Sequence, residues 1–405
     1  MSIKEYDMKF LFITNPAYGH LNPQLGIISE LVKKGHKVVV YNTQEFAEKI
    51  KQTGAEFRSP PFKIDKFELR QMDSALNIAE KILEIADPAI TSLNNVVSYE
   101  HFDCLLHDAV SLWGKIVGLK NKIPTVSLVP SMAINSKVIL AYTKYLLSDY
   151  WQEIKKPLRT LETFKRHSMF YKNIGEKTPP IFDLFINKER LNIVFTSRYF
   201  QPFAESFDSS YKFVGPIIFD RKEEQVPSEL LQTDKPIVYV SLGTAFNDDI
   251  IFYKTLINAF SQLPYQAFIS IGSYLKNSDL GKIPENVHVK NYLPQLEILK
   301  KSSLFISHGG MNSVNESLYF GVPMLLFPII QEQHVNASRV EELGFGIYFH
   351  NKIINQGEII SAVQKILKDS FYSQNAKMIS KTQHEAGGLT AAVNQILDYA
   401  SRTTN

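Results

Sequence analysis

Short apolar runs with strand character alternate with amphipathic stretches along this chain of 405 residues, and the alternation stops once and then starts again. The interruption is a polar, proline-bearing segment, Phe219–Ser228, which has the composition of a linker. A chain of this length is too long for one ordinary hydrophobic core. The pattern therefore predicts two α/β domains in tandem, each with a doubly wound sheet.

The first strand is expected at Lys9–Thr14 and the first helix at Pro23–Lys34. Asn22 would cap that helix, with Pro23 at its first position. A strong break is expected near the end of the chain at Gly387–Gly388. The other expected strands are Lys37–Tyr41, Cys104–His107, Thr125–Val129, Asn192–Thr196, Ile237–Ser241, Ala267–Ile271, Val287–Lys290, Leu304–Ser307 and Pro323–Phe327.

Composition excludes several classes of protein. The net charge is only +3, and basic residues are interspersed with acidic ones, so nucleic-acid binding is not expected. The chain contains no run of about 18 apolar residues, the length needed to span a bilayer. Its amino terminus does not resemble a signal peptide. Cys104 is the only cysteine and lies in an apolar run, so we expect no internal disulfide. A cytoplasmic enzyme is the expected class.

Two residues near the ends of predicted strands could form a general base. His20 follows the first strand, and Asp108 directly follows Cys104–His107. If these strands are neighbours, Asp108 reaches one ring nitrogen of His20 and leaves the other free to take a proton. Period-two alternation places His107 on the opposite face, where we expect it to pack. The alternative is a loop histidine and a helix-capping aspartate with no chemical role.

A second candidate site lies where the run ending at Ser307 is followed by a helix. His308 and Gly309–Gly310 form the turn, and Asn312 and Ser313 fall in the first helical turn. Unpaired N–H groups at a helix start favour an anion, and glycines allow a ligand to approach the backbone. The alternative is a pair of glycines that serve only tight packing.

Other parts of the second half bear on this site. The segment Ser241–Thr244 ends another strand with small hydroxyl residues that could donate to a phosphate. The chain has no G-x-G-x-x-G and no G-x-x-x-x-G-K-[ST] pattern, which argues against a dinucleotide enzyme and a P-loop protein. No metal-ligand spacing is present, and Asp248–Asp249 are expected to be the first carboxylates of a helix.

Taken together, these residues resemble the UDP-glycosyltransferase superfamily, and within it the bacterial macrolide-type transferases. The resemblance covers nearly the whole chain, through Gly19–His20, the linker, Ser241–Thr244 and a long signature from Tyr292 to Gln333. It implies the GT-B fold, in which two Rossmann-like doubly wound domains face each other across a cleft. We expect an acceptor-binding domain at 1–218, a linker at 219–233, a donor-binding domain at 234–385, and a carboxy-terminal helix at 386–405 that packs back on the first domain.

By this resemblance, the second domain binds a nucleotide sugar. His308, Ser313 and Thr244 would hold the diphosphate, with Asn312 supporting them. Glu316 would accept hydrogen bonds from ribose hydroxyls, while Glu332 and Gln333 would contact the sugar. Gln295 would meet the base, and Tyr292 offers a smaller aromatic face than the Trp of many relatives. The complete predicted donor set is Ser241, Gly243, Thr244, Tyr292, Leu293, Gln295, His308, Gly309, Gly310, Asn312, Ser313, Glu316, Glu332 and Gln333.

The implied reaction is inverting transfer of a hexose, with glucose expected, from a UDP-sugar to a hydroxyl of a small hydrophobic acceptor such as a phenolic or a macrolide. His20 and Asp108 would be catalytic, with no metal and no cofactor besides the co-substrate, and a thymidine-linked donor remains an alternative. We expect no nucleic-acid partner, no stable membrane insertion, and a monomer or weak dimer. The rival functions are a non-catalytic nucleotide-sugar-binding protein, a sugar-nucleotide epimerase and a lipid glycosyltransferase.

Overall fold

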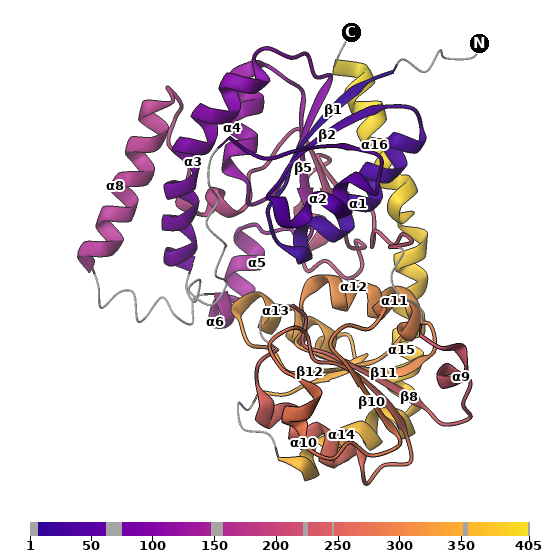
Figure 1. Ribbon diagram of the computed structural model, residues 1–405. Coiled ribbons are helices and arrows are strands. Elements are labelled where there is room, and N and C mark those ends of the chain that lie inside the picture. Colours follow the sequence, from indigo (N-terminus) through magenta and orange to yellow (C-terminus); the bar gives the residue numbers. More distant parts are fainter. Residues whose placement is uncertain are drawn as a thin grey trace. The chain divides into compact units, whose positions relative to one another are not determined.

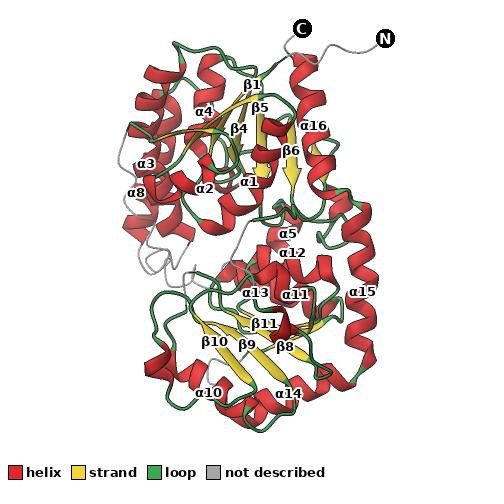
Figure 2. Cartoon of the chain, turned by 45° about the vertical axis from the view of Figure 1, so that its right-hand side comes forward, coloured by secondary structure: helices red, strands yellow, loops and turns green. Residues whose placement is uncertain are grey.

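The computed structural model describes residues 7–61, 75–146, 157–221, 226–244, 247–350 and 355–403, which fall into two compact units (Figure 1). Unit 1 comprises Met1–Phe219 and Ala386–Asn405, and unit 2 is Asp220–Glu385. Every strand pairing that the structure describes is parallel, and helices flank both faces of each sheet (Figure 2). The predicted pair of doubly wound α/β folds is confirmed.

The sheet of unit 1 has the strand order β3-β2-β1-β4-β5-β6-β7. The chain thus builds outward from β1 to β3 and then returns to the other side of β1, so the strand order reverses between β1 and β4. The strands are β1 (Lys9–Ile13), β2 (Lys37–Tyr41), β3 (Glu56–Arg58), β4 (Cys104–Asp108), β5 (Thr125–Val129), β6 (Leu191–Val194) and β7 (Tyr211–Phe213). The short strands β3 and β7 were not predicted.

Alternating residues of β1 supply the two cores of unit 1. Phe10 and Phe12 pack with α1 and α16 on one face, and Leu11 and Ile13 pack with α3 and α4 on the other. This division follows from the period-two alternation of a strand that is buried on both sides. The helices are α1 (Tyr18–Lys33), α2 (Ala47–Lys51), α3 (Ala75–Val97), α4 (Leu112–Asn121), α5 (Ser136–Ala141), α6 (Thr143–Leu146), α8 (Pro157–Asn173) and α16 (Gly388–Thr403).

The predicted start of the first helix is wrong. Helix α1 begins at Tyr18 rather than at Pro23, and its N-cap is Ala17, which is extended. The amides of His20 and Leu21 already bond to the Ala17 carbonyl, at 3.0 and 2.9 Å. Pro23 is tolerated inside the helix although it has no N–H to donate to the preceding turn. As a result, His20 lies in the first helical turn and not in a loop.

Unit 2 repeats the topology of unit 1, with the strand order β10-β9-β8-β11-β12-β13 and a reversal between β8 and β11. Its strands are β8 (Ile237–Ser241), β9 (Gln266–Ser270), β10 (Val287–Lys290), β11 (Ser302–Ser307), β12 (Met324–Leu326) and β13 (Gly346–Tyr348). Its helices are α9 (Ser228–Leu231), α10 (Ile250–Phe260), α11 (Gln295–Leu299), α12 (Met311–Phe320), α13 (Gln331–Glu342), α14 (Gln356–Lys368) and α15 (Ser370–Glu385).

The last two helices belong to different units. Helix α15 packs against α12 and α14 of unit 2, whereas α16 packs against α1 of unit 1. They are separated at Gly387 and Gly388, both of which have positive φ angles, and the Gly388 amide donates to the Val214 carbonyl at 2.6 Å. The predicted break in this region is confirmed. None of the described helices is both long and apolar enough to cross a bilayer.

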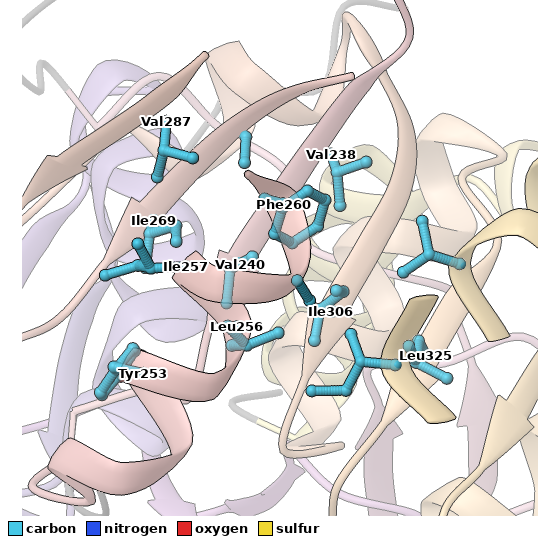
Figure 3. Packing of buried hydrophobic residues seen from close by; sticks show 14 of the residues in the cluster. Val238, Val240, Tyr253, Leu256, Ile257, Phe260, Ile269, Val287, Ile306 and Leu325 are labelled. Atoms are coloured by element: carbon cyan, nitrogen blue, oxygen red, sulfur yellow. The ribbon is translucent and has the colours of Figure 1, made fainter. Parts of the chain in front are cut away.

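The main core of unit 2 lies between its sheet and α10 (Figure 3). Phe260 on α10 is fully buried there, while Ile251 on the same helix is 74% exposed. Phe260→Ala should therefore lower the free energy of unfolding by about 3–5 kcal/mol, through lost burial and the cavity left behind. Ile251→Ala should change it by no more than about 0.5 kcal/mol. Urea denaturation followed by circular dichroism measures both, and equal losses in the two variants would contradict this view of the core.

Candidate active site

An imidazole and a carboxylate meet at the reversal point of unit 1. Strands β1 and β4 are adjacent, with Ile13 opposite His107, so the residues that follow both strands emerge at one edge of the sheet. The Nδ1 atom of His20 lies 2.8 Å from Oδ2 of Asp108. The His20 side chain is 31% exposed, and that of Asp108 is fully buried. The adjacency required for the predicted pair is therefore present, and the contact is made through Nδ1 of the ring.

Asp108 also accepts hydrogen bonds from three N–H groups. Asn15 donates through Nδ2 at 3.2 Å, Gln24 through Nε2 at 3.0 Å, and the backbone amide of Val110 at 3.1 Å. Such bonds stabilise a carboxylate that is removed from water. Sequence reasoning missed Asn15 and Gln24. Gln24 follows His20 by four residues and so shares its helix face, a signal that becomes visible only when α1 starts at Tyr18.

His107 faces away from this pair. It is fully buried, with Nδ1 at 2.9 Å from the Asp108 carbonyl oxygen and Nε2 at 3.3 Å from Glu189 Oε1. The expectation that His107 packs inside the protein is confirmed. Cys104 is also buried, and burial raises the pKa of its thiol, so it is not a nucleophile.

The two glycine-containing turns of unit 2 lie side by side at its own reversal point. Ser241 at the end of β8 is opposite Ser307 at the end of β11. The turn after β8 contains Gly243, and the turn after β11 contains His308 and Gly309. Gly310 is the N-cap of α12. The predicted strand, turn and helix start are all present.

The glycines close around the imidazole of His308. A Cβ atom on Gly243 would lie 2.7 Å from Cε1 of that ring, and one on Gly310 would lie 2.6 Å from Nε2. Gly243 and Gly309 also have φ angles of 77° and 83°, which favour glycine. Each of these positions therefore needs glycine for a structural reason, and Gly243 and Gly310 are the two that leave room for the His308 ring.

The His308 ring is neutral at physiological pH. Burial lowers its pKa from 6.5 to about 4, although a hydrogen bond to the Ser241 backbone acts in the opposite direction. Ser307 Oγ lies 3.3 Å from Nδ1 of the ring. A neutral imidazole next to the start of α12 donates one hydrogen bond and accepts another, so it can bind an anion without a buried positive charge of its own.

Two buried amides hold the backbone of these turns. Asn247 donates through Nδ2 to the Gly243 carbonyl at 2.7 Å, and Asn336 on α13 donates to the Gly309 carbonyl at 2.9 Å. Both side chains are about 1% exposed. Sequence reasoning missed them, because an asparagine several residues away carries no local sign that it bonds to a turn.

Glu316 forms a buried cluster with residues from two other segments. It is 3% exposed, one carboxylate oxygen contacts Nη2 of Arg221, and the other accepts from Nε2 of Gln295 at 2.7 Å. Gln295, which was predicted to meet the base, is the first residue of α11, and its side-chain amide donates to Glu316. Nearby, Tyr292 is 63% exposed, which leaves its aromatic face accessible, and Leu293 is half-buried.

Two predicted residues at the start of α13 differ from each other in burial. Gln333 is 4% exposed, and its Oε1 accepts from the amides of Ile329 and Ile330 at 2.8 and 3.3 Å, which fixes the loop before the helix. Glu332 is exposed in the first turn. The remaining predicted residues are Thr244, which is exposed, Asn312, which is half-buried, and Ser313, which is buried.

No metal centre is evident in the part of the chain that the structure describes, because no three His, Cys, Asp or Glu side chains there are grouped to hold an ion. Asp249 instead caps α10 by accepting from the Phe252 amide at 2.9 Å, as predicted.

Two parallel-sheet units, each with its candidate residues at the point where the strand order reverses, have the architecture of the GT-B class of transferases. A family model described as "UDP-glucoronosyl and UDP-glucosyl transferase" matches residues 193–390. The chain is 34% identical over 99% of its length to the NDP-glycosyltransferase YjiC of Bacillus subtilis (strain 168), 99% of which is covered. It is 27% identical to the oleandomycin glycosyltransferase of Streptomyces antibioticus, over 94% of this chain and 88% of that one.

Solved structures agree on the fold. The glycosyltransferase of kitacinnamycin superposes with a TM-score of 0.85 at 24% identity, over 98% of this chain and 100% of that one. The chain belongs to the UDP-glycosyltransferase family. It is a glycosyltransferase that uses a nucleotide sugar as its donor, and the non-catalytic alternative is therefore set aside.

The neutral state of His308 can be tested by titration. Its ring should take up a proton near pH 4 in the ligand-free protein, since burial lowers its pKa to about 4. The unfolded chain binds this proton at higher pH, so the contribution of His308 to stability is present above about pH 6.5 and is lost as the pH falls toward 4. Nitrogen-15 NMR of labelled imidazoles measures the titration, and a His308→Gln variant assigns the signal. Protonation at or above pH 6 would contradict the expectation.

Proposed function

We propose that this protein is an inverting, metal-independent glucosyltransferase, which moves glucose from UDP-glucose to a hydroxyl of a small hydrophobic natural product. The observation that carries the proposal is the 2.8 Å contact between His20 Nδ1 and Asp108 Oδ2. Unit 1 would bind the acceptor and unit 2 the donor, which follows the predicted division of the chain.

In the proposed reaction, His20 acts as the general base. Its Nε2 atom removes the proton of the acceptor hydroxyl, and the oxygen lone pair forms a bond to the anomeric carbon. The bond from that carbon to the diphosphate oxygen breaks at the same time, and its electron pair leaves with UDP. Asp108 stabilises the resulting imidazolium through Nδ1, and attack from the side opposite the leaving group inverts an α-linked donor to a β-glycoside.

The leaving diphosphate would be met by the turns of unit 2. His308, Ser313 and Thr244, together with the N–H groups at the start of α12, are the proposed donors, with Asn312 and the backbone around Ser241, Gly243, Gly309 and Gly310 in support. Preorganised donors of this kind stabilise charge as it develops in the transition state, often as the largest catalytic contribution. The neutral state of His308 supports the role, since the ring can donate a hydrogen bond to the anion without a permanent positive charge of its own.

The nucleoside and the sugar would lie on either side of this turn. The exposed ring of Tyr292 is proposed to stack on the base next to Leu293 and Gln295, and Glu316 to accept from the ribose. Glu332 and Gln333 would contact the hydroxyls of glucose. The name of the Bacillus subtilis relative specifies no single base, so a thymidine-linked donor is the alternative to uridine.

The acceptor is proposed from the relatives rather than from a pocket. Four apolar residues of the first half, Phe62, Met132, Tyr142 and Phe170, are of the kind that could line an acceptor pocket. Met132, Tyr142 and Phe170 are all buried and pack inside unit 1, and Phe62 lies outside the described residues. Since one relative is named for a macrolide, oleandomycin, we propose macrolides and phenolics as the acceptor class. A cytoplasmic location and a monomer or weak dimer complete the proposal.

Incubation with UDP-glucose and a panel of phenolic and macrolide acceptors, in the presence of EDTA, tests the function directly. Mass spectrometry should show a gain of one hexose on an acceptor, and NMR of the product should show a β-linkage. Consumption of UDP-glucose without an acceptor would favour an epimerase or hydrolase. A requirement for added divalent metal would overturn the proposed mechanism.

Replacing His20 by Ala should lower turnover by ~10²–10⁴-fold, the usual contribution of a general base, with little change in donor affinity. Steady-state kinetics and calorimetric titration with UDP measure the two quantities. His101→Ala is the matched control, since the His101 side chain is 81% exposed and lies at the opposite, amino-terminal end of β4. Wild-type turnover in His20→Ala would remove His20 from the mechanism.

A further inference from the structure

The carboxylate of Glu316 is held by an arginine that neither the proposed mechanism nor the family signature uses. Arg221 is the second residue of unit 2 and precedes Glu316 by 95 residues. The two side chains are 13% and 4% exposed, so the ion pair is largely removed from water. The other oxygen of Glu316 accepts from Gln295 at 2.7 Å. Each oxygen of this buried carboxylate therefore has one partner from the protein.

We infer that Arg221 controls how strictly the donor site requires a 2′-hydroxyl, and that its ion pair with Glu316 makes the site tolerant of 2′-deoxyribose donors. The inference rests on the proposed function, in which Glu316 accepts hydrogen bonds from the ribose. Arg221 is in this sense a positioning and specificity residue, because it acts on the nucleotide through Glu316.

Counting acceptor sites gives the physical reason. An ionised carboxylate can accept about four hydrogen bonds, two on each oxygen. Arg221 and Gln295 use one on each oxygen of Glu316, which leaves one on each for the 2′- and 3′-hydroxyls of a ribose. The buried carboxylate can thus bind the ribose diol without giving up either protein partner.

A donor that lacks the 2′-hydroxyl leaves one of these acceptor sites empty. The penalty for an empty site is large when it leaves a buried polar atom with no partner, and small when the atom keeps another bond. With Arg221 present, the oxygen that loses the hydroxyl still has an N–H group of the protein. Without Arg221, one oxygen of the buried charge would depend on the ribose alone, so the same missing hydroxyl would cost much more.

The cleanest probes are UDP and 2′-deoxy-UDP, which share the base and the diphosphate and differ at a single oxygen. Calorimetric titration gives the dissociation constant of each nucleotide. The ratio of the constant for 2′-deoxy-UDP to that for UDP should be below about 10 for the wild type. In Arg221→Gln the ratio should rise by about 10–100-fold, the range of a hydrogen bond to a buried charge. Arg221→Lys keeps a cation and should restore a ratio near that of the wild type.

The ratio separates specificity from a merely structural role. If Arg221 only supported the fold, its loss would weaken both nucleotides equally and leave the ratio unchanged, which would overturn the inference. A wild-type ratio above about 10 would overturn it as well. Arg402→Gln is the matched control, because Arg402 pairs with Asp398 on the surface of α16 and its side chain is 75% exposed.

Circular dichroism would reveal misfolding of Arg221→Gln. In that case, a second variant still tests the inference. Gln295→Leu removes the partner of the other carboxylate oxygen, which in this arrangement accepts from the 3′-hydroxyl. It should therefore raise the ratio measured with 3′-deoxy-UDP against UDP, and an unchanged ratio there would contradict the argument from acceptor sites. Failure of the wild type to bind either nucleotide would instead refute the proposed donor class. The two failures are therefore distinguishable in one set of titrations.

Discussion

Both candidate sites depend on one constraint, which is the reversal of strand order in a parallel sheet. Strand order reverses between β1 and β4 in unit 1 and between β8 and β11 in unit 2. At a reversal, the connections after the two central strands leave toward opposite faces of the sheet, so the space beyond their carboxyl ends stays open for a ligand. His20 and Asp108 occupy that place in unit 1, and Gly243 and His308 occupy it in unit 2.

Local sequence was sufficient for most strands because each is buried on both faces and appears as a short apolar run. Strands β2, β5 and β8 match their predicted ranges. The start of α1 was misplaced because proline normally marks a first helical turn, and at Pro23 the surrounding packing overrides that preference. Strands β3, β7 and β13 were not predicted, because they contain only three residues each and lie at the edges of their sheets, where no periodic signal marks them.

For the sites, sequence identified residues at strand ends, but it gave the contact between His20 and Asp108 only as a condition on strand order and did not give the other contacts. The pairing of His20 with Asp108 required β1 and β4 to be neighbours, a fact of topology that spans 88 residues of sequence. The Arg221–Glu316 pair could not be predicted either, because its members lie far apart in the sequence. In addition, a charged residue in a polar segment such as that of Arg221 normally faces solvent. Roles inferred from family resemblance named Glu316, but they did not reveal which groups of the protein already occupy its oxygens.

The two units treat the charge of an imidazole in opposite ways. In the proposed reaction, one arrangement suits the attacking hydroxyl and the other suits the leaving diphosphate. In unit 1 the buried carboxylate of Asp108 lies against the imidazole of His20, and in the proposed mechanism it stabilises the positive charge that this ring gains with a proton. In unit 2 the imidazole of His308 is kept neutral by burial, at the start of a helix whose N–H groups favour an anion. In the proposed mechanism, a permanent positive charge there would hold the nucleotide diphosphate before and after transfer alike, and uniform binding of that kind does not accelerate the chemical step. A neutral ring that strengthens its hydrogen bond as charge develops would instead act selectively on the transition state. The glycines and buried asparagines around His308 fix its position in advance, so little reorganisation is needed when the leaving group departs.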